Sequence, residues 1–238
     1  MKTYWLLLLF AFLSACDNDI TGPRVRGTGP TESEVRTVSS FNRIDLKINA
    51  EVVVTQGSPQ QVRVEAQRNV LDVLETELNG DELQIEFGKV NIRDHDPIKI
   101  YITTPSLTEV QLSGSGKIRS GAPLNTTTCV VDVSGSGEVE LNFAQATSLR
   151  TNLSGSGEMR LSGISQSHNS STSGSGRISA YNLATQDTYA SITGSGRSYV
   201  QASRTLNAEI SGSGTVYYRG NPKVSTCITG SGRVLAGD

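Results

Sequence analysis

The chain has 238 residues, and its 21 Lys and Arg residues against 23 Asp and Glu residues give a formal net charge of −2. Because no block of Lys and Arg stands out from this near-neutral balance, the sequence gives no indication of nucleic-acid binding. Aromatic residues make up only 5% of the chain, which disfavours, without excluding, a sugar cleft lined by aromatic side chains or a base-stacking platform.

The first predicted element, residues 1–16, is an export signal. Lys2 precedes an apolar run from Trp5 to Leu13 that is too short to span a bilayer and is typical of a secretory signal peptide. The run ends in LSAC, which resembles the lipobox of bacterial lipoproteins. This resemblance implies cleavage before Cys16 and lipid attachment to it, whereas an ordinary signal peptide with a chance cysteine is the alternative. We expect a cell-envelope protein, lipid-anchored to the outer membrane, with its periplasmic or surface face left open.

Residues 17–35 are rich in Gly, Pro, Thr and charge and lack apolar periodicity, which predicts a flexible tether. Residues 36–238 are expected to form a single β-solenoid domain. Its first part, residues 36–107, alternates less regularly and predicts either degenerate opening coils or a β cap that blunts the end of the solenoid. Within it, the NGDE stretch at Asn79–Glu82 predicts a hairpin. NVLDVLETEL, residues 69–78, has some helical spacing, but the turn that follows favours a strand.

Residues 108–238 contain seven Ser/Thr-Gly-Ser-Gly runs whose first glycines lie 18–21 residues apart. A period near twenty indicates a solenoid and not a flexible linker. Most runs lie between apolar residues six positions apart, such as Leu112 and Ile118, and an even spacing puts both on one side of an extended chain. Thr172 and Ser198 interrupt this apolar pattern. The predicted fold class is therefore all-β, a parallel β-solenoid with about 18–21 residues per coil.

Both glycines of each run share the parity of the apolar residues, so we expect them to face inward. They would either pinch the solenoid or relieve strain where the chain bends at a corner. These structural glycines are Gly114, Gly116, Gly135, Gly137, Gly155, Gly157, Gly174, Gly176, Gly194, Gly196, Gly212, Gly214, Gly230 and Gly232.

The central serine of each run is expected to face outward, so that the serines form one column along the solenoid. We consider this column a candidate binding face for a polysaccharide or another regular surface. Its members are Ser115, Ser136, Ser156, Ser175, Ser195, Ser213 and Ser231. The alternative is that these serines only fit close-stacked turns and contact water, since every solenoid needs polar outward columns.

The remaining reactive side chains predict no chemistry. Cys129 and Cys227 would lie five coils apart, roughly 24 Å at the usual strand spacing, which exceeds the roughly 4.4–6.8 Å Cα separation of a disulfide. We therefore predict that both are unpaired. His95 and His168 are far apart in sequence, and RDHDP around His95 lacks a second cluster that would complete a metal site. We expect no catalytic residue, no metal and no cofactor.

Three stretches carry a family resemblance: SFNRIDLKINAEVVVTQG, LQIEF, and IKIYITTPSLTEVQLSGSGKI with the runs that follow it. From about Phe41 to the C-terminus, they resemble the putative auto-transporter adhesin, head GIN domain family, exported and commonly lipid-anchored proteins best known from Bacteroidetes. The resemblance implies a right-handed β-helix-like fold, and it supplies no catalytic residues.

Together these features predict a non-enzymatic envelope protein that binds a polysaccharide or a surface protein. Two alternatives stay open. One is an enzyme on a β-helix like that of polysaccharide lyases, which would need columns of Asp, Lys or Arg along a groove. The other is a structural protein that associates with copies of itself, end to end or side by side.

Overall fold

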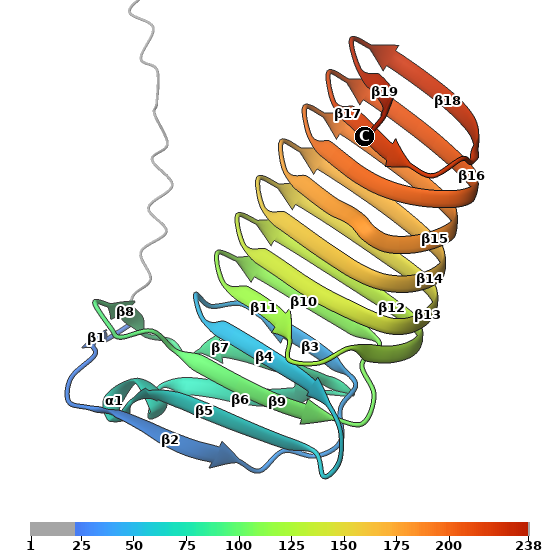
Figure 1. The fold of residues 1–238 in the computed structure, drawn as a ribbon. Coiled ribbons are helices and arrows are strands. Elements are labelled where there is room, and N and C mark those ends of the chain that lie inside the picture. The colour runs from blue at the N-terminus through green and yellow to red at the C-terminus, as the bar shows by residue number, and fades with distance from the viewer. Residues whose placement is uncertain (1–21, 238) are drawn as a thin grey trace, which may run out of the picture.

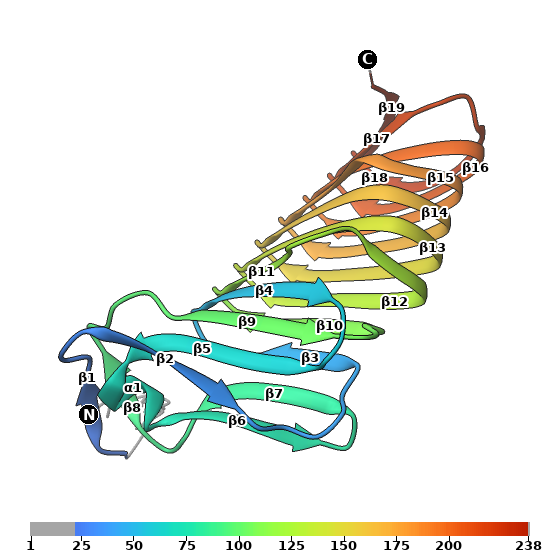
Figure 2. The same cartoon turned by 60° about the horizontal axis from the view of Figure 1, so that its bottom comes forward.

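The computed structural model describes residues 22–237, and every regular element except one short helix is a β-strand. Figures 1 and 2 show a mixed β region in the N-terminal part and a stack of β coils in the C-terminal part. The elements are β1 (Arg24–Arg26), β2 (Thr31–Arg36), β3 (Arg43–Leu46), β4 (Glu51–Gln56), β5 (Gln61–Gln67), α1 (Arg68–Leu71), β6 (Leu74–Asn79), β7 (Glu82–Phe87), β8 (Asn91–Arg93), β9 (Lys99–Thr104), β10 (Glu109–Gly114), β11 (Lys117–Ser120), β12 (Leu124–Gly135), β13 (Glu138–Gly155), β14 (Glu158–Gly174), β15 (Arg177–Gly194), β16 (Arg197–Gly212), β17 (Thr215–Arg219), β18 (Lys223–Gly230) and β19 (Arg233–Ala236).

Strands β10 to β19 form the coils, and each coil pairs in parallel with the next. The repeat sets the register, because the residue before each run lies over its counterpart in the neighbouring coil. This column contains Leu112, Val133, Leu153, Thr172, Ile192, Ile210 and Ile228. The prediction of an all-β solenoid is confirmed.

Each coil consists of an outgoing segment, a bend and a return segment, as β13 illustrates. Val139, Leu141 and Phe143 alternate into the interior on the outgoing segment. The register with the next coil then slips between Phe143 and Ala146, where the chain bends, and the return segment brings Leu153 back inside. The coil is therefore flattened, with a narrow corner at the glycine run and a wider bend opposite it (Figure 1).

The first glycine of each run does not face inward as expected. These glycines have φ between +110° and +125° and are exposed or half-buried, so the chain turns at each of them. Glycine allows this backbone conformation at little cost. The second glycine does face inward: at Gly157, a Cβ atom would lie 2.6 Å from the carbonyl oxygen of Gly137 and 3.1 Å from Val133 Cγ1. The two glycines thus make a corner, the second of the two arrangements that the sequence left open.

The N-terminal region contains both opening coils and a cap. β3 and β4 lie in register with β10 and β11, which places Leu46 beside Leu112 and Val52 beside Ile118. Parallel strands β7 and β9 continue the stack beyond β3 and β4. Antiparallel strands then close this end, because β2 pairs with β5, β5 with β9, and β6 with β7. The β6–β7 pair is the hairpin predicted at Asn79–Glu82.

Two local predictions in this region are wrong. Residues 17–35 were expected to form a flexible tether, yet residues 24–26 form β1 and residues 31–35 lie in β2, which pairs along its whole length with β5. Residues 68–71, at the start of the stretch expected to be a strand, form α1, and β6 begins at Leu74. Residues 1–16 with Cys16, and the start of the predicted tether, lie outside the described residues. Within the described range, no helix is long and apolar enough to cross a membrane.

The interior divides into two apolar clusters. The larger runs from Phe41 in the cap to Leu183 in β15, and the smaller runs from Ala190 to Val216. Buried polar side chains lie in the coils around this division: Thr151, Ser165, His168, Ser170, Thr172, Thr185, Thr188 and Ser198. Thr172 and Ser198, which interrupt the apolar pattern in the sequence, are therefore inside the solenoid and form part of this polar layer.

Candidate functional site

Three outward columns lie side by side after the corner, and we call them together the corner face. The serine column consists of Ser115, Ser136, Ser156, Ser175, Ser195, Ser213 and Ser231. Two residues further along, the charged column consists of Lys117, Glu138, Glu158, Arg177, Arg197, Thr215 and Arg233. Two residues further again, the outer column consists of Arg119, Glu140, Arg160, Ser179, Tyr199, Tyr217 and Leu235.

The serine column is exposed at all seven coils. Its backbone is fixed by the corner, since the amide of Ser156 donates to the carbonyl of Gly135 at 2.9 Å and the amide of Ser175 donates to Gly155 at 3.0 Å. The hydroxyl groups of the column have no hydrogen-bond partner in residues 22–237. They are therefore available to a ligand or to water.

The N-terminal half of the corner face is electrically balanced. Across Lys117 to Arg160, the charged and outer columns hold three cations and three carboxylates. Lys117 bonds Glu138 at 3.2 Å, and Arg160 bonds Glu158 at 2.7 Å. Arg119 bonds Glu51 of β4 at 2.8 Å, and this hydrogen bond lowers the pKa of the Glu51 carboxyl. The charges here neutralise one another.

The C-terminal half of the corner face is basic. Its charged column carries Arg177, Arg197 and Arg233, and its two columns contain no carboxylate. Within residues 22–237, none of these three guanidinium groups forms an ion pair. Glu158 lies beside Arg177 in the strand register, but among the described residues it forms its ion pair with Arg160. Positive charge is therefore left uncompensated on this half.

Tyrosines also gather on this half. The rings of Tyr199 and Tyr217 stack with centroids 4.9 Å apart and an interplanar angle of 8°, and Tyr181 meets Tyr199 edge-on at 5.3 Å. The guanidinium of Arg177 lies 5.9 Å from the Tyr199 ring centroid. Because the aromatic content of the whole chain is low, this cluster was not predicted from the sequence. Its signal in the sequence was the 18-residue spacing of these tyrosines, which is one coil.

A shallow groove of about 350 Å³ opens at the N-terminal side of this tyrosine stack. In the outer column, Ser179 lies between Arg160 and Tyr199, so a small side chain is flanked by two long ones. The groove lies over Ser179, and the rest of its lining consists of Glu140, Arg160, Leu161, Ser162, Arg177, Tyr181, Asn182 and Tyr199. It offers a ligand two aromatic rings, two guanidinium groups and neutral hydrogen-bonding groups, with a single carboxylate, that of Glu140.

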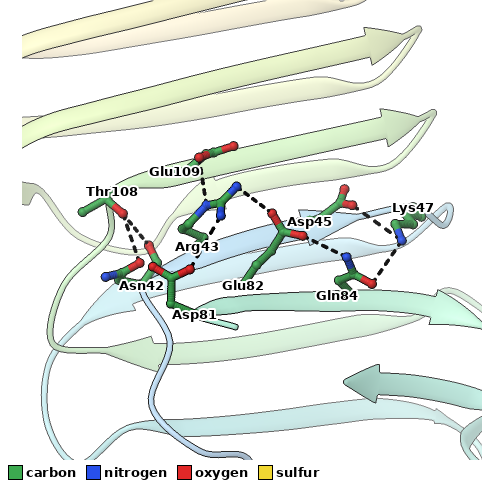
Figure 3. A network of polar contacts seen from close by, with 9 residues as sticks. All are labelled: Asn42, Arg43, Asp45, Lys47, Asp81, Glu82, Gln84, Thr108 and Glu109. Carbon is green, nitrogen blue, oxygen red and sulfur yellow. Dashed lines mark hydrogen bonds and ion pairs between the residues drawn. The ribbon is translucent and has the colours of Figure 1, made fainter. Parts of the chain in front are cut away.

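A second polar cluster lies where the cap meets the first coil (Figure 3). Arg43 stands between Glu82 of β7 and Glu109 of β10 in the strand register and contacts them at 3.0 and 2.9 Å. The Lys47 ammonium bonds Glu86 at 2.9 Å. The other residues drawn are Asn42, Asp45, Asp81, Gln84 and Thr108. Such charge pairs along neighbouring strands fix the register of the cap on the coils.

One carboxylate in this cluster is buried. Asp45 is 4% exposed and one of its oxygens, Oδ1, has no hydrogen-bond partner among the described residues. Burial raises the pKa of Asp45, and the Lys47 ammonium 3.8 Å away opposes the rise only in part. Because its ion pairs join neighbouring strands of the cap and the first coil, we assign the cluster to the joint between cap and coils.

The histidines and cysteines are dispersed. His168 is buried inside β14 with its Nε2 2.9 Å from Thr151 Oγ1, and burial lowers its pKa to about 4. His95 lies in a loop beside Asp96. Cys129 is buried, which raises its pKa to about 12, whereas Cys227 is exposed, and both are free thiols. In residues 22–237, no group of three or more His, Cys, Asp or Glu side chains is placed to hold a metal ion.

One family model matches the chain, and several solved structures share its fold. A family model described as "Putative auto-transporter adhesin, head GIN domain" matches residues 40–222. A solved structure of a putative adhesin from Bacteroides fragilis is similar with a TM-score of 0.84 and 23% identity, over 90% of this chain and 100% of that one. A putative lipid binding protein from Parabacteroides distasonis matches with a TM-score of 0.78 and 26% identity, at the same coverage. No curated protein matches the sequence.

A putative adhesin from Parabacteroides distasonis has the same fold, with a TM-score of 0.76 and 23% identity over 90% of this chain and 100% of that one. The matched residues 40–222 include the opening coils β3 and β4 and most of the solenoid, and they make up well over half of the chain. The family is one of putative adhesins and is not a known enzyme family. The chain therefore belongs to the putative auto-transporter adhesin, head GIN domain family.

Proposed function

We propose that this protein is a non-enzymatic adhesion module of the cell envelope, anchored through lipid on Cys16, that binds an extended polymer along the corner face. One observation carries the proposal: the exposed hydroxyls of the serine column recur in strict register on consecutive coils, without protein partners in residues 22–237. Coils repeat about every 4.8 Å. A surface with so short and regular a repeat fits a ligand that is itself a repeating chain.

A binding screen tests this proposal. Chain 22–238 would be applied to an array of polysaccharides and matrix proteins, beside a variant that carries Ser175→Glu, Ser195→Glu and Ser213→Glu. A matched control changes Ser173, Thr193 and Ser211 to Glu, because these residues are also exposed and lie on the same coils, on the other side of the corner. We expect a polymer that binds the parent and the control but not the first variant. Absence of binding, or equal binding by all three, would refute the proposal.

Self-association is a second candidate, favoured by the last described coil. Val224 and Ile228 there are 36% and 41% exposed, although their counterparts in the preceding coil, Leu206 and Ile210, are buried. The antiparallel cap closes the other end of the stack. Two copies would therefore meet through identical C-terminal coils and form a closed dimer, since a filament needs two different open ends.

Sedimentation of chain 22–238 over a range of concentrations tests this candidate. We expect a monomer–dimer equilibrium that Ile228→Lys shifts to monomer, while Ile164→Lys, at an exposed position on β14, leaves it unchanged. A parent that sediments as a monomer at every concentration would exclude tail-to-tail pairing.

A further inference from the structure

We infer that the ligand of the corner face is an acidic polysaccharide and that its binding site lies on β15 to β17, in the basic, tyrosine-rich half. This inference rests on the proposed function and adds the chemical class of the ligand and its position. Three features of the described residues carry it: the charge of this half, its tyrosine stack and the groove over Ser179.

The distribution of charge selects an anionic ligand and positions it. Arg177 and Arg197 face outward on neighbouring coils and have no carboxylate partner within residues 22–237. Glu140 of the outer column lines the groove beside Arg160, and Glu138 and Glu158 occupy the charged column on the N-terminal side. A polyanion gains attraction from the arginines and meets repulsion near these carboxylates. It is therefore expected to lie over the C-terminal coils and to end its contact near β14.

The tyrosine stack selects a sugar over a simple anion. Because Tyr199 and Tyr217 are nearly parallel on neighbouring coils, their stack runs along the solenoid. The next position in this direction lies over Ser179, whose side chain is too small to fill it, and the groove of about 350 Å³ opens there. The apolar face of a pyranose ring packs well on an aromatic side chain. A sugar ring in the groove would thus extend the stack.

The polar groups of the groove complete the match to an acidic sugar. Arg177 lines the groove and lies 5.9 Å from the Tyr199 ring centroid, so a carboxylate on a sugar stacked against that ring would come close to the guanidinium. Asn182 and Ser179 in the lining can hydrogen-bond ring hydroxyls. Arg197, one coil further, is placed to meet an acidic group on the next part of the chain. The site would thus recognise both the negative charge and the pyranose ring of an acidic sugar.

Paired glycans test the inference. Binding of chain 22–238 would be measured by biolayer interferometry on polygalacturonate and on its fully methyl-esterified form, which has the same backbone without charge, and on chondroitin sulfate with its desulfated form. We expect binding to the charged member of at least one pair, weakened at higher salt, and at least tenfold weaker binding to the neutral member. The double variant R177Q/R197Q should lose about tenfold, because two charge-assisted contacts per bound segment disappear.

A charge-matched control separates a built site from general attraction. Arg24 and Arg150 are exposed and form no ion pair in the described chain, so R24Q/R150Q removes the same charge elsewhere. It should bind like the parent, and Y199S should weaken binding at a temperature at which its circular dichroism spectrum shows that it is fully folded. Equal loss in both double variants, equal binding of charged and neutral glycans, or binding only of proteins would overturn the inference and leave the proposed function standing. A chain that binds nothing in this panel or in the wider array would refute both.

Discussion

Most of the first corner glycines are required for two reasons, namely their backbone conformation and their close contact with the preceding coil. Gly155 has φ of +113°, and a Cβ atom there would lie 2.6 Å from the carbonyl oxygen of Gly135 in the preceding coil. Gly114 has nearly the same conformation, φ +125°, yet its nearest neighbour would be 4.0 Å away. The difference arises because the corner before Gly114 has Ile48 and Ala50 in place of glycines.

Substitutions at Gly114 and Gly155 distinguish the cost of backbone strain from the cost of a clash with the preceding coil. Gly114→Ala should cost about 1–2 kcal/mol for a left-handed backbone at a residue with a side chain. Gly155→Ala should cost a few kcal/mol more, because the preceding coil must also move. Urea unfolding of the two variants measures the difference. Equal losses would mean that the corner glycines are needed only for their φ angle.

His168 gives the solenoid a specific sensitivity to acid. Burial lowers its pKa from the ordinary 6.5 to about 4, so between these values the unfolded chain takes up a proton that the folded chain does not. Folding stability is therefore complete above pH 6.5 and falls as the pH drops toward 4. A shift of this size corresponds to about 3 kcal/mol.

The measurement is the free energy of unfolding between pH 7.5 and 4 for the parent and for His168→Leu. Leucine suits the site, since Leu149 occupies the same position in the neighbouring coil. The variant leaves Thr151 without its partner, which costs stability equally at every pH. We expect a shallower fall with acid in His168→Leu, and parallel curves would show that His168 does not titrate in this way.

At the scale of the element, the polar layer in β14 is a local weakness of the core. Thr172 is 1% exposed between Leu153 and Ile192 in its column, and its hydroxyl has no partner among the described residues. An unsatisfied buried hydroxyl costs about 1–3 kcal/mol. Thr172→Val should therefore raise the free energy of unfolding by about 1 kcal/mol. Thr151→Val is the matched control and should lower it, because Thr151 hydrogen-bonds His168. Destabilisation by Thr172→Val would show that its hydroxyl is satisfied.

The coils could be predicted from sequence because each repeats the same parity, and register follows from stacking like residues. The outward direction of the first corner glycine could not be predicted, because the alternation of sides holds only while the chain stays extended. The φ angles of +110° to +125° at these glycines end that alternation. β2 pairs with β5 at the edge of the cap and is largely exposed. Its TESEVR sequence therefore has no apolar alternation and resembles a linker. The tyrosine stack was missed because composition averages over the chain, whereas stacking brings Tyr199 and Tyr217 together.

At the scale of the whole molecule, stability is expected to fall from the cap toward the C-terminal coils. The larger apolar cluster joins the cap to the coils as far as Leu183, and the smaller one supports only the coils beyond the polar layer. β18 has no buried residue. In a stack where each coil contacts mainly its neighbours, such a division allows one end to unfold while the other stays folded.

Hydrogen exchange and urea unfolding of chain 22–238 test this gradient. We expect amides of β17 to β19 to exchange first, those of β16 next and those of β3, β4 and β9 last, with two transitions in urea. Joining the clusters should merge the transitions. Ser170 and Ser198, whose buried hydroxyl oxygens lie 3.4 Å apart, can be replaced together by alanine, which leaves neither hydroxyl unpaired. Uniform protection and a single transition in the parent would instead mean that the polar layer transmits cooperativity as well as an apolar one.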